Sequence, residues 1–135
     1  MKIIVAYDNS EPSRRALQTV GWFAAAQPEI VIVKVLMGTA LDAEGEPMKA
    51  DSEDEQMAEE TLLQARSVVE PSGVSVRTEI LVGDPKHAIL HKAAEENADL
   101  IITGCRGHGL TKRLVFGSVS SVILHDAECP VMVVK

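Results

Sequence analysis

Glycines are frequent late in the chain, at Gly104, Gly107, Gly109 and Gly117, and Ser118 follows the last of them, a composition typical of an anion-binding loop. Glycine has no Cβ, so its backbone can turn sharply and lie directly against a ligand. A serine that caps a helix stands beside the free N–H groups of the helix start, where the positive end of the dipole attracts negative charge. The stretch 100–125 contains no Asp or Glu, although the whole chain carries a net charge of −7. This segment therefore predicts a phosphate-binding loop, with Ser118 as the helix cap.

Two widely shared phosphate motifs do not fit this loop. A Walker A loop ends in Gly-Lys-Ser/Thr, whereas Leu110 and Thr111 follow Gly109 here. The dinucleotide-binding fingerprint places glycines in the first strand-to-helix turn, but the turn at 8–10 has none. The spacing that remains, Gly-x2-Gly-x9-Gly-Ser, could by itself also serve backbone geometry without any ligand.

The elements that must position this loop alternate between strands and helices. Short apolar or alternating runs predict five strands, at residues 2–7, 30–36, 74–80, 100–102 and 131–134. Apolar residues at helical spacing predict four helices, from Ser10 to about Gln27, from Ser52 to about 70, after Pro85 and after Ser118. The acidic, glycine-containing segment 37–54 is expected to be a solvated crossover loop, with a mobile lid over a ligand as the alternative.

Buried helix faces follow from the same spacing. In the second helix we expect the buried stripe to be Met57, Leu62, Ala65 and Val69. In the third helix we expect the inward residues to be Ala88, Ile89, Ala93 and Ala94. His87 and His91 are expected to lie on a solvated face, so no metal site is predicted.

The order of elements predicts an α/β fold: a five-stranded parallel sheet, doubly wound, with helices on both faces and right-handed crossovers. The third strand alternates apolar and polar residues, as a half-exposed edge strand does, so the strand order 3-2-1-4-5 is expected. The topological switch then falls between strands one and four, and ligands bind at such a point. Asp8 ends the first strand and Gly104 ends the fourth, so both should border one crevice.

The bulk composition is that of a single globular domain over residues 1–135, with 46% hydrophobic residues. The net charge of −7 argues against a nucleic-acid-binding surface, which needs a broad basic face. No run is long enough to span a membrane, and the first residues lead directly into a strand rather than a signal peptide. A cytoplasmic location and no membrane partner are therefore expected.

Further motifs are spread along the chain at residues 6–13 (Ala-Tyr-Asp-Asn-Ser-Glu-Pro-Ser), 83–85 (Gly-Asp-Pro), 99–101 (Asp-Leu-Ile) and 129–131 (Cys-Pro-Val). Together with the glycine spacing, they make the chain similar to the small, single-domain universal stress proteins. The similarity covers nearly the whole chain except the loop 37–54. One departure is Asn9, which stands where many family members have glycine, although Asn tolerates unusual backbone dihedrals.

This resemblance implies a Rossmann-like fold that binds ATP, or AMP or another adenine nucleotide, and Mg²⁺ could accompany the nucleotide. By the family pattern, Asp8 would hold the ribose, although a helix-start cap is the alternative role for this residue. The adenine would lie against the backbone of Ala6, Tyr7 and Val35. The remaining implied contacts are Thr103 and Gly104 to base and sugar, and Gly107, Gly117, Ser118 and Val119 to the phosphates.

The function expected from this resemblance is that of an ATP-binding protein in stress response or signalling. No catalytic residue is predicted, because no obvious general base stands beside the phosphates; a slow ATPase and a nucleotide-free interaction module are the alternatives. The apolar last strand, Val131–Val134, would form a sheet edge open to pairing with another chain. A homodimer through this strand is expected, as the family commonly forms.

Overall fold

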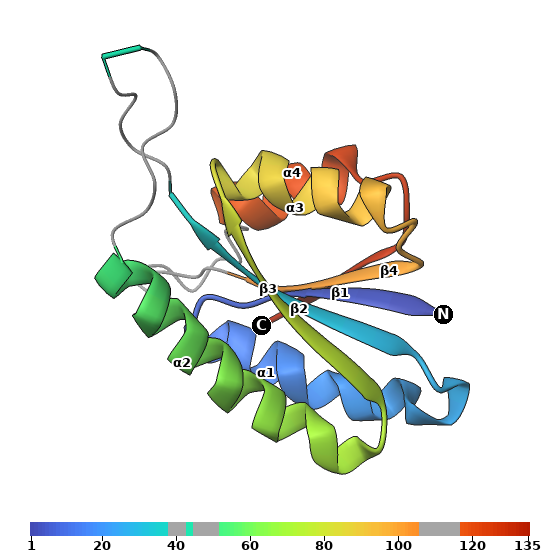
Figure 1. Cartoon of the computed structure of the whole chain (residues 1–135). Coiled ribbons are helices and arrows are strands. Elements are labelled where there is room, and N and C mark those ends of the chain that lie inside the picture. The colour runs from blue at the N-terminus through green and yellow to red at the C-terminus, as the bar shows by residue number, and fades with distance from the viewer. Residues whose placement is uncertain (38–42, 45–51, 106–116) are drawn as a thin grey trace.

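The computed structural model describes residues 1–37, 43–44, 52–105 and 117–135. Its elements alternate as expected from the sequence (Figure 1). In chain order they are β1 (Lys2–Ala6), α1 (Glu11–Thr19), η1 (Val20–Ala26), β2 (Glu29–Leu36), α2 (Ser52–Val69), η2 (Glu70–Ser72), β3 (Ser75–Val82), α3 (Pro85–Glu95), β4 (Leu100–Gly104), α4 (Ser118–Asp126) and β5 (Val131–Val134), where η marks a 3-10 helix. Most of the expected loop at 37–54 lies outside the described residues.

The five strands form one parallel sheet in the order β3-β2-β1-β4-β5. The predicted fold class and strand order are therefore confirmed. In the centre of the sheet, Val5 of β1 pairs with Ile32 of β2 on one side and with Ile102 of β4 on the other. Helices α1 and α2 cover one face, and α3 and α4 cover the other (Figure 1). The third strand lies at the edge, as its alternating pattern predicts.

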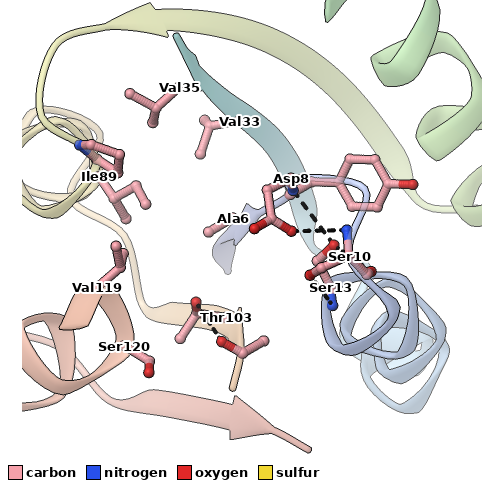
Figure 2. A pocket seen from close by; sticks show the side chains of 13 residues that line it. Ala6, Asp8, Ser10, Ser13, Val33, Val35, Ile89, Thr103, Val119 and Ser120 are labelled. Carbon is pink, nitrogen blue, oxygen red and sulfur yellow. Dashed lines mark hydrogen bonds between the residues drawn. The ribbon is translucent and has the colours of Figure 1, made fainter. Parts of the chain in front are cut away.

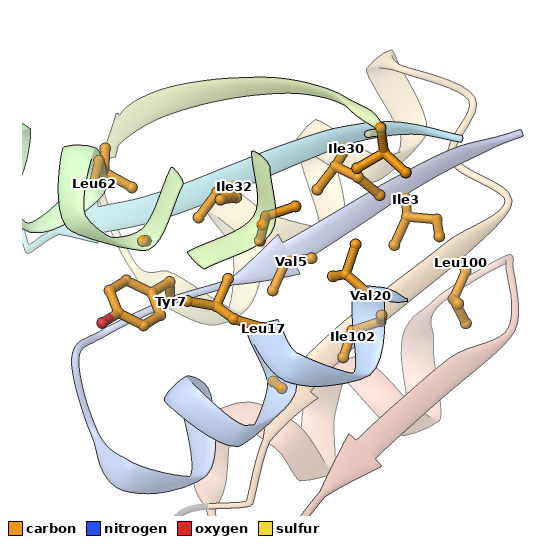
Figure 3. Packing of buried hydrophobic residues seen from close by; sticks show 14 residues of the cluster. Ile3, Val5, Tyr7, Leu17, Val20, Ile30, Ile32, Leu62, Leu100 and Ile102 are labelled. Atoms are coloured by element: carbon orange, nitrogen blue, oxygen red, sulfur yellow. The ribbon is translucent and has the colours of Figure 1, made fainter. Parts of the chain in front are cut away.

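Two hydrophobic cores lie on the two faces of the sheet, and the strand alternation divides the side chains between them. Ile3 and Val5 point toward α1 and α2, where they pack with Leu17 and Leu62 (Figure 3). Ile4 points the other way and packs in the second core, whose other fully buried large side chains are Val31, Val33, Ile101 and Ile123. The central strands β1, β2 and β4 are buried on both faces, which explains why their sequences are almost entirely apolar.

The first helical segment differs from the expected single helix over 10–27. Ser10 is the N-cap, as its position suggests, but the α-helical part ends at Thr19 and a 3-10 helix follows. The sequence from Thr19 to Phe23 contains two β-branched residues, a glycine and two aromatics, which all have lower helix propensity than residues 14–18 before them. Gln27 then adopts a left-handed conformation with φ of 49° before Pro28.

Two expected buried positions are wrong, and the cause is helical phase. Met57 is 66% exposed, because the buried stripe of α2 runs through Ala58, Leu62, Ala65 and Val69 and leaves Met57 about 100° away. In α3, Ile89 and Ala93 are buried as expected, but Ala94 is exposed and Lys92 is buried instead.

Lys92 belongs to a charged cluster at the amino ends of the strands. Its ammonium lies 3.2 Å from a carboxylate oxygen of Glu96, and the other oxygen of Glu96 lies 2.7 Å from Lys2 Nζ and 2.9 Å from Arg77 Nη2. Hydrogen bonds from Lys2, then from Arg77 and Lys92, lower the pKa of the Glu96 carboxyl from 4.5 to about 2. The cluster joins β1 and β3 to the end of α3.

Among the described residues, no helix is both long enough and apolar enough to cross a bilayer.

Candidate functional site

A cavity opens at the carboxyl ends of β1, β2 and β4, where β1 and β4 lead to opposite sides of the sheet. It encloses about 520 Å³ of empty space, part of it open to solvent. Its lining comes from the strand ends and from the starts of α1, α3 and α4: Ala6, Tyr7, Asp8, Ser10, Ser13, Val33, Val35, Pro85, Ile89, Thr103, Gly104, Val119 and Ser120. This is the switch point of the sheet, where open α/β folds bind ligands.

One side of the cavity is apolar. Ala6, Val33 and Val35 project from the ends of β1 and β2, and Ile89 and Val119 face them from α3 and α4 (Figure 2). These short aliphatic side chains carry no polar atoms and leave backbone N–H and C=O groups of the strand ends as the nearby hydrogen-bonding groups. A flat, apolar ring with polar edges suits such a surface.

The other side carries a carboxylate and several hydroxyls. Asp8 lies two residues after the end of β1, and its Oδ1 accepts a hydrogen bond from the Ser10 N–H at 3.0 Å. Thr103 and Ser120 add hydroxyls from β4 and α4, and Ser120 Oγ donates to the Gly117 carbonyl at 3.1 Å. A carboxylate has about four acceptor positions, so Asp8 can accept hydrogen bonds from neighbouring hydroxyls of a ligand.

The turn that presents Asp8 depends on Asn9. Asn9 has φ of 65°, a left-handed conformation in which Asn is among the better tolerated residues. Its Oδ1 accepts hydrogen bonds from Tyr7 Oη at 3.1 Å and from Arg14 Nη2 at 3.1 Å. The departure from glycine at this position is therefore accommodated. The alternative role of Asp8 as helix cap is wrong, because Ser10 is the N-cap and accepts from the Ser13 N–H.

Gly104 ends β4 against the first turn of α1. A Cβ at this position would lie 2.7 Å from Ser13 N and 2.8 Å from Pro12 C, both backbone atoms that cannot move aside cheaply. The absence of a side chain at Gly104 is thus required by the packing of the protein itself. At this one glycine, backbone geometry accounts for the residue type, whatever the ligand.

The start of α4 differs from the sequence prediction by one residue. Gly117 is the N-cap and makes no side-chain capping bond, while Ser118 is the first helical residue and is exposed. The expected cap at Ser118 is therefore wrong, since Ser118 is already part of the helix and does not precede it. A helix start without a side-chain cap keeps its first N–H groups available for water or for an anion.

Most of the expected site residues meet in this one cavity: Ala6, Tyr7, Asp8, Val35, Thr103, Gly104 and Val119. Gly117 and Ser118 are not part of its lining but immediately precede Val119, and Gly107 lies outside the described residues. Sequence reasoning missed the other members: Ser10, Ser13, Val33, Pro85, Ile89 and Ser120. Val33 could have been predicted from the sequence, because it lies two residues before Val35 and therefore on the same face of the strand.

No metal-binding group is evident in the part of the chain that the structure describes: no three His, Cys, Asp or Glu side chains are arranged to hold an ion there. His87 and His91 are 77% and 81% exposed and lie beside Asp84 and Glu95, respectively, on α3.

Comparison with known proteins places the chain in a family. A profile of the Universal stress protein family matches residues 1–135. The chain belongs to this family. Universal stress protein MJ0531 of Methanocaldococcus jannaschii is 32% identical over 138 residues, which cover 99% of this chain and 81% of the relative.

Solved universal stress protein structures share the fold. One from Archaeoglobus fulgidus is 29% identical with a TM-score of 0.83, covering 100% of this chain and 98% of its own. A structure of the universal stress protein from Archaeoglobus fulgidus in complex with dAMP is 28% identical with a TM-score of 0.79 and the same coverage. A protein of this fold and family thus binds an adenine nucleotide.

Proposed function

We propose that this universal stress protein binds ATP, or a related adenine nucleotide such as AMP, in the cavity at the carboxyl ends of β1, β2 and β4. The observation that carries the proposal is the pairing of an apolar slot with the Asp8 carboxylate at the switch point of the sheet. The dAMP complex of a 28% identical relative supports it.

The chemistry of the lining matches the three parts of a nucleotide. The adenine ring fits between the aliphatic side chains of Val35 and Ile89, with the strand-end backbone at Ala6 and Tyr7 beside its polar edge. Asp8 can accept hydrogen bonds from ribose hydroxyls. Thr103 and Gly104 border the base and sugar on the other side.

The phosphates belong at the start of α4. Val119 lines the cavity there, and Gly117 and Ser118 contribute N–H groups at the positive end of the helix dipole. Gly107 is assigned to the same role on sequence grounds alone. A bound polyphosphate would bring Mg²⁺ with it, since that ion is commonly held by phosphates and few protein ligands.

The proposed role is a cytoplasmic one in stress response or signalling: a single domain over residues 1–135 whose nucleotide occupancy is read by other proteins. It is proposed to work as a homodimer through β5, an edge strand of four half-buried residues. Catalysis is not favoured. Among the described residues that line the cavity, Asp8 is the one carboxylate and there is no histidine.

Titration calorimetry with ATP, AMP and GTP tests the proposal. Saturable binding of ATP or AMP in a 1:1 ratio with the chain is expected, with GTP weaker because the apolar slot offers little to its extra polar groups. A phosphate-release assay run in parallel should give a rate near that of the buffer. No heat with any adenine nucleotide would contradict the proposal, and rapid turnover would favour the ATPase.

A further inference from the structure

The first turn of α1 contains a hydroxyl buried between the two sides of the crevice. Ser13 is 2% exposed and lines the cavity. Its Oγ donates to the carbonyl of Ser10 at 2.8 Å and accepts from the Asp8 N–H at 3.5 Å. This one hydroxyl therefore joins the helix to the backbone of the turn that bears the carboxylate.

The hydrogen bonds continue from the turn back to the carboxylate. The Ser10 N–H donates to Asp8 Oδ1 at 3.0 Å, and the Ser13 N–H donates to Ser10 Oγ at 3.4 Å (Figure 2). Asp8, Ser10 and Ser13 thus form a closed set of contacts in which the orientation of the carboxylate depends on the backbone that Ser13 holds.

Ser13 is also fixed from the side of β4. The ideal Cβ position on Gly104 lies 2.7 Å from Ser13 N, so the helix start packs directly on the end of that strand. Ser13 is therefore located at the junction between the turn after β1, which bears Asp8, and the end of β4. A displacement of Ser13 would change the distance between the two walls of the cavity.

From these contacts we infer that Ser13 is a positioning residue, which holds the Asp8 carboxylate in the place where it receives the ribose hydroxyls. The inference rests on the proposed nucleotide binding. It assigns to Ser13 an effect on the sugar part of the ligand in particular, rather than on binding in general.

The test compares two ligands in two proteins. ATP presents both ribose hydroxyls, whereas 2′,3′-dideoxy-ATP has neither, so the ratio of their dissociation constants reports the contact with Asp8. Ser13→Ala is expected to raise the dissociation constant for ATP about tenfold, as the loss of one to two hydrogen bonds does. The constant for 2′,3′-dideoxy-ATP should change less than about twofold.

Thr19→Val provides a matched control in the same helix. Thr19 is also buried, and its Oγ1 donates to the carbonyl three residues earlier, at 2.7 Å, as Ser13 Oγ does. It lies at the far end of α1 from the cavity. This variant should lower thermal stability to a similar degree and leave both dissociation constants unchanged.

The inference is overturned if Ser13→Ala folds and keeps the wild-type ratio of the two constants, whether or not it melts earlier. Ser13→Cys fills nearly the same space with a much weaker hydrogen-bonding group, and it supplies the same readout should the alanine variant not fold. Wild-type protein that binds neither nucleotide would remove the proposed function and this inference together. Wild-type protein that prefers ATP, alongside variants that keep this preference, would remove the inference alone.

Discussion

Asp8 is the residue on which the proposed chemistry depends most. It lies just beyond β1, whose three central residues are fully buried, beside aliphatic side chains and in a turn held by Asn9, Ser10 and Ser13. A carboxylate held in one orientation can accept two hydrogen bonds from a ribose without reorganising, and a charged acceptor makes these bonds stronger than neutral ones.

Replacing Asp8 with asparagine should weaken ATP binding by about tenfold to a hundredfold, because hydrogen bonds to a charged group contribute about 1.5–3 kcal/mol. The substituted amide would keep one acceptor oxygen and lose the charge. Titration calorimetry measures the change. Asp126→Asn, at the exposed end of α4, removes the same charge away from the cavity and should bind ATP as the wild type does; equal weakening in both variants would mean that net charge alone is at work.

Gly104→Ala should destabilise the protein by about 2 kcal/mol, since overpacking against a backbone that cannot yield costs about 1–3 kcal/mol. The added methyl would lie 2.7 Å from Ser13 N. Urea unfolding gives the value. Gly21→Ala is the control, because a Cβ there meets its nearest atom, Ser72 Oγ, at an ordinary 3.7 Å. A fully stable Gly104→Ala variant would show that the close packing of α1 on β4 is not as described.

At the scale of elements, the starts of α1 and α4 form two sides of the cavity and differ in how they are capped. The Ser10 side chain caps α1, whereas Gly117 leaves α4 without a side-chain cap. The uncapped helix is the one assigned to the phosphates. An anion at that end would supply the hydrogen bonds that a serine supplies at the other.

Ser10→Ala should therefore cost about 1 kcal/mol of stability, the usual contribution of an N-cap side chain. Ser118→Ala should change stability by less than about 0.5 kcal/mol, because the Ser118 side chain is exposed and caps no backbone N–H group of the helix. Thermal or urea unfolding of both variants checks this difference. A larger loss at Ser118 would restore it as the cap that the sequence suggests.

The sequence was sufficient to predict the sheet, because its central strands are unbroken apolar runs and its third strand alternates. Helix details were harder. The apolar spacing puts Met57 in the buried stripe of α2, one residue out of phase with Ala58, and the sequence puts the cap of α4 one residue late, at Ser118. Such errors arise because neighbouring residues in a helix are separated by only about 100°, and because tertiary packing decides which face is buried.

The cavity was partly predictable for a related reason. Asp8 and Gly104 follow from strand ends at a switch point, whereas Val35 and Thr103 are implied only by the resemblance to the family. Ile89 and Ser13, in contrast, reach the cavity through the packing of α3 and α1 onto the sheet, and no local pattern in the sequence reports that approach. In the sequence, Ser13 resembles any serine in the first turn of a helix; only the structure shows that Gly104 packs closely against its backbone nitrogen.

On the scale of the whole molecule, the carboxyl ends and the amino ends of the strands contribute to different properties of the protein. The cavity occupies the carboxyl ends of the strands, and the cluster around Glu96 occupies the amino ends. Because Glu96 contacts β1, β3 and α3 together, its contribution is to stability rather than to the cavity.

Glu96→Gln should lower stability by about 2 kcal/mol at pH 7, since it removes hydrogen bonds between charged groups. The folded-state pKa of Glu96 is about 2, below its ordinary 4.5, so its contribution is complete above about pH 4.5 and is lost as the pH falls toward 2. The difference in the free energy of unfolding between wild type and variant, measured with urea, should therefore decrease by about 2 kcal/mol between about pH 5 and pH 2. A difference independent of pH would contradict this account of the cluster.

Val133→Lys should convert the proposed homodimer to a monomer, because a lysine on an edge strand opposes pairing with another chain. Its neighbours Met132 and Val134 pack against the core beside α1, whereas Val133 lies on the other face of β5. Light scattering after size exclusion reports the mass. Wild-type protein that is monomeric at micromolar concentration would remove the proposed dimer.

The central claim, that an adenine nucleotide occupies the crevice where β1 and β4 diverge, is tested most directly by a crystal structure grown with ATP. The account predicts the base between Val35 and Ile89, the ribose hydroxyls within hydrogen-bonding distance of the Asp8 carboxylate, and the phosphates at the start of α4. Nucleotide bound elsewhere, or a crevice without nucleotide at saturating ATP, would contradict it.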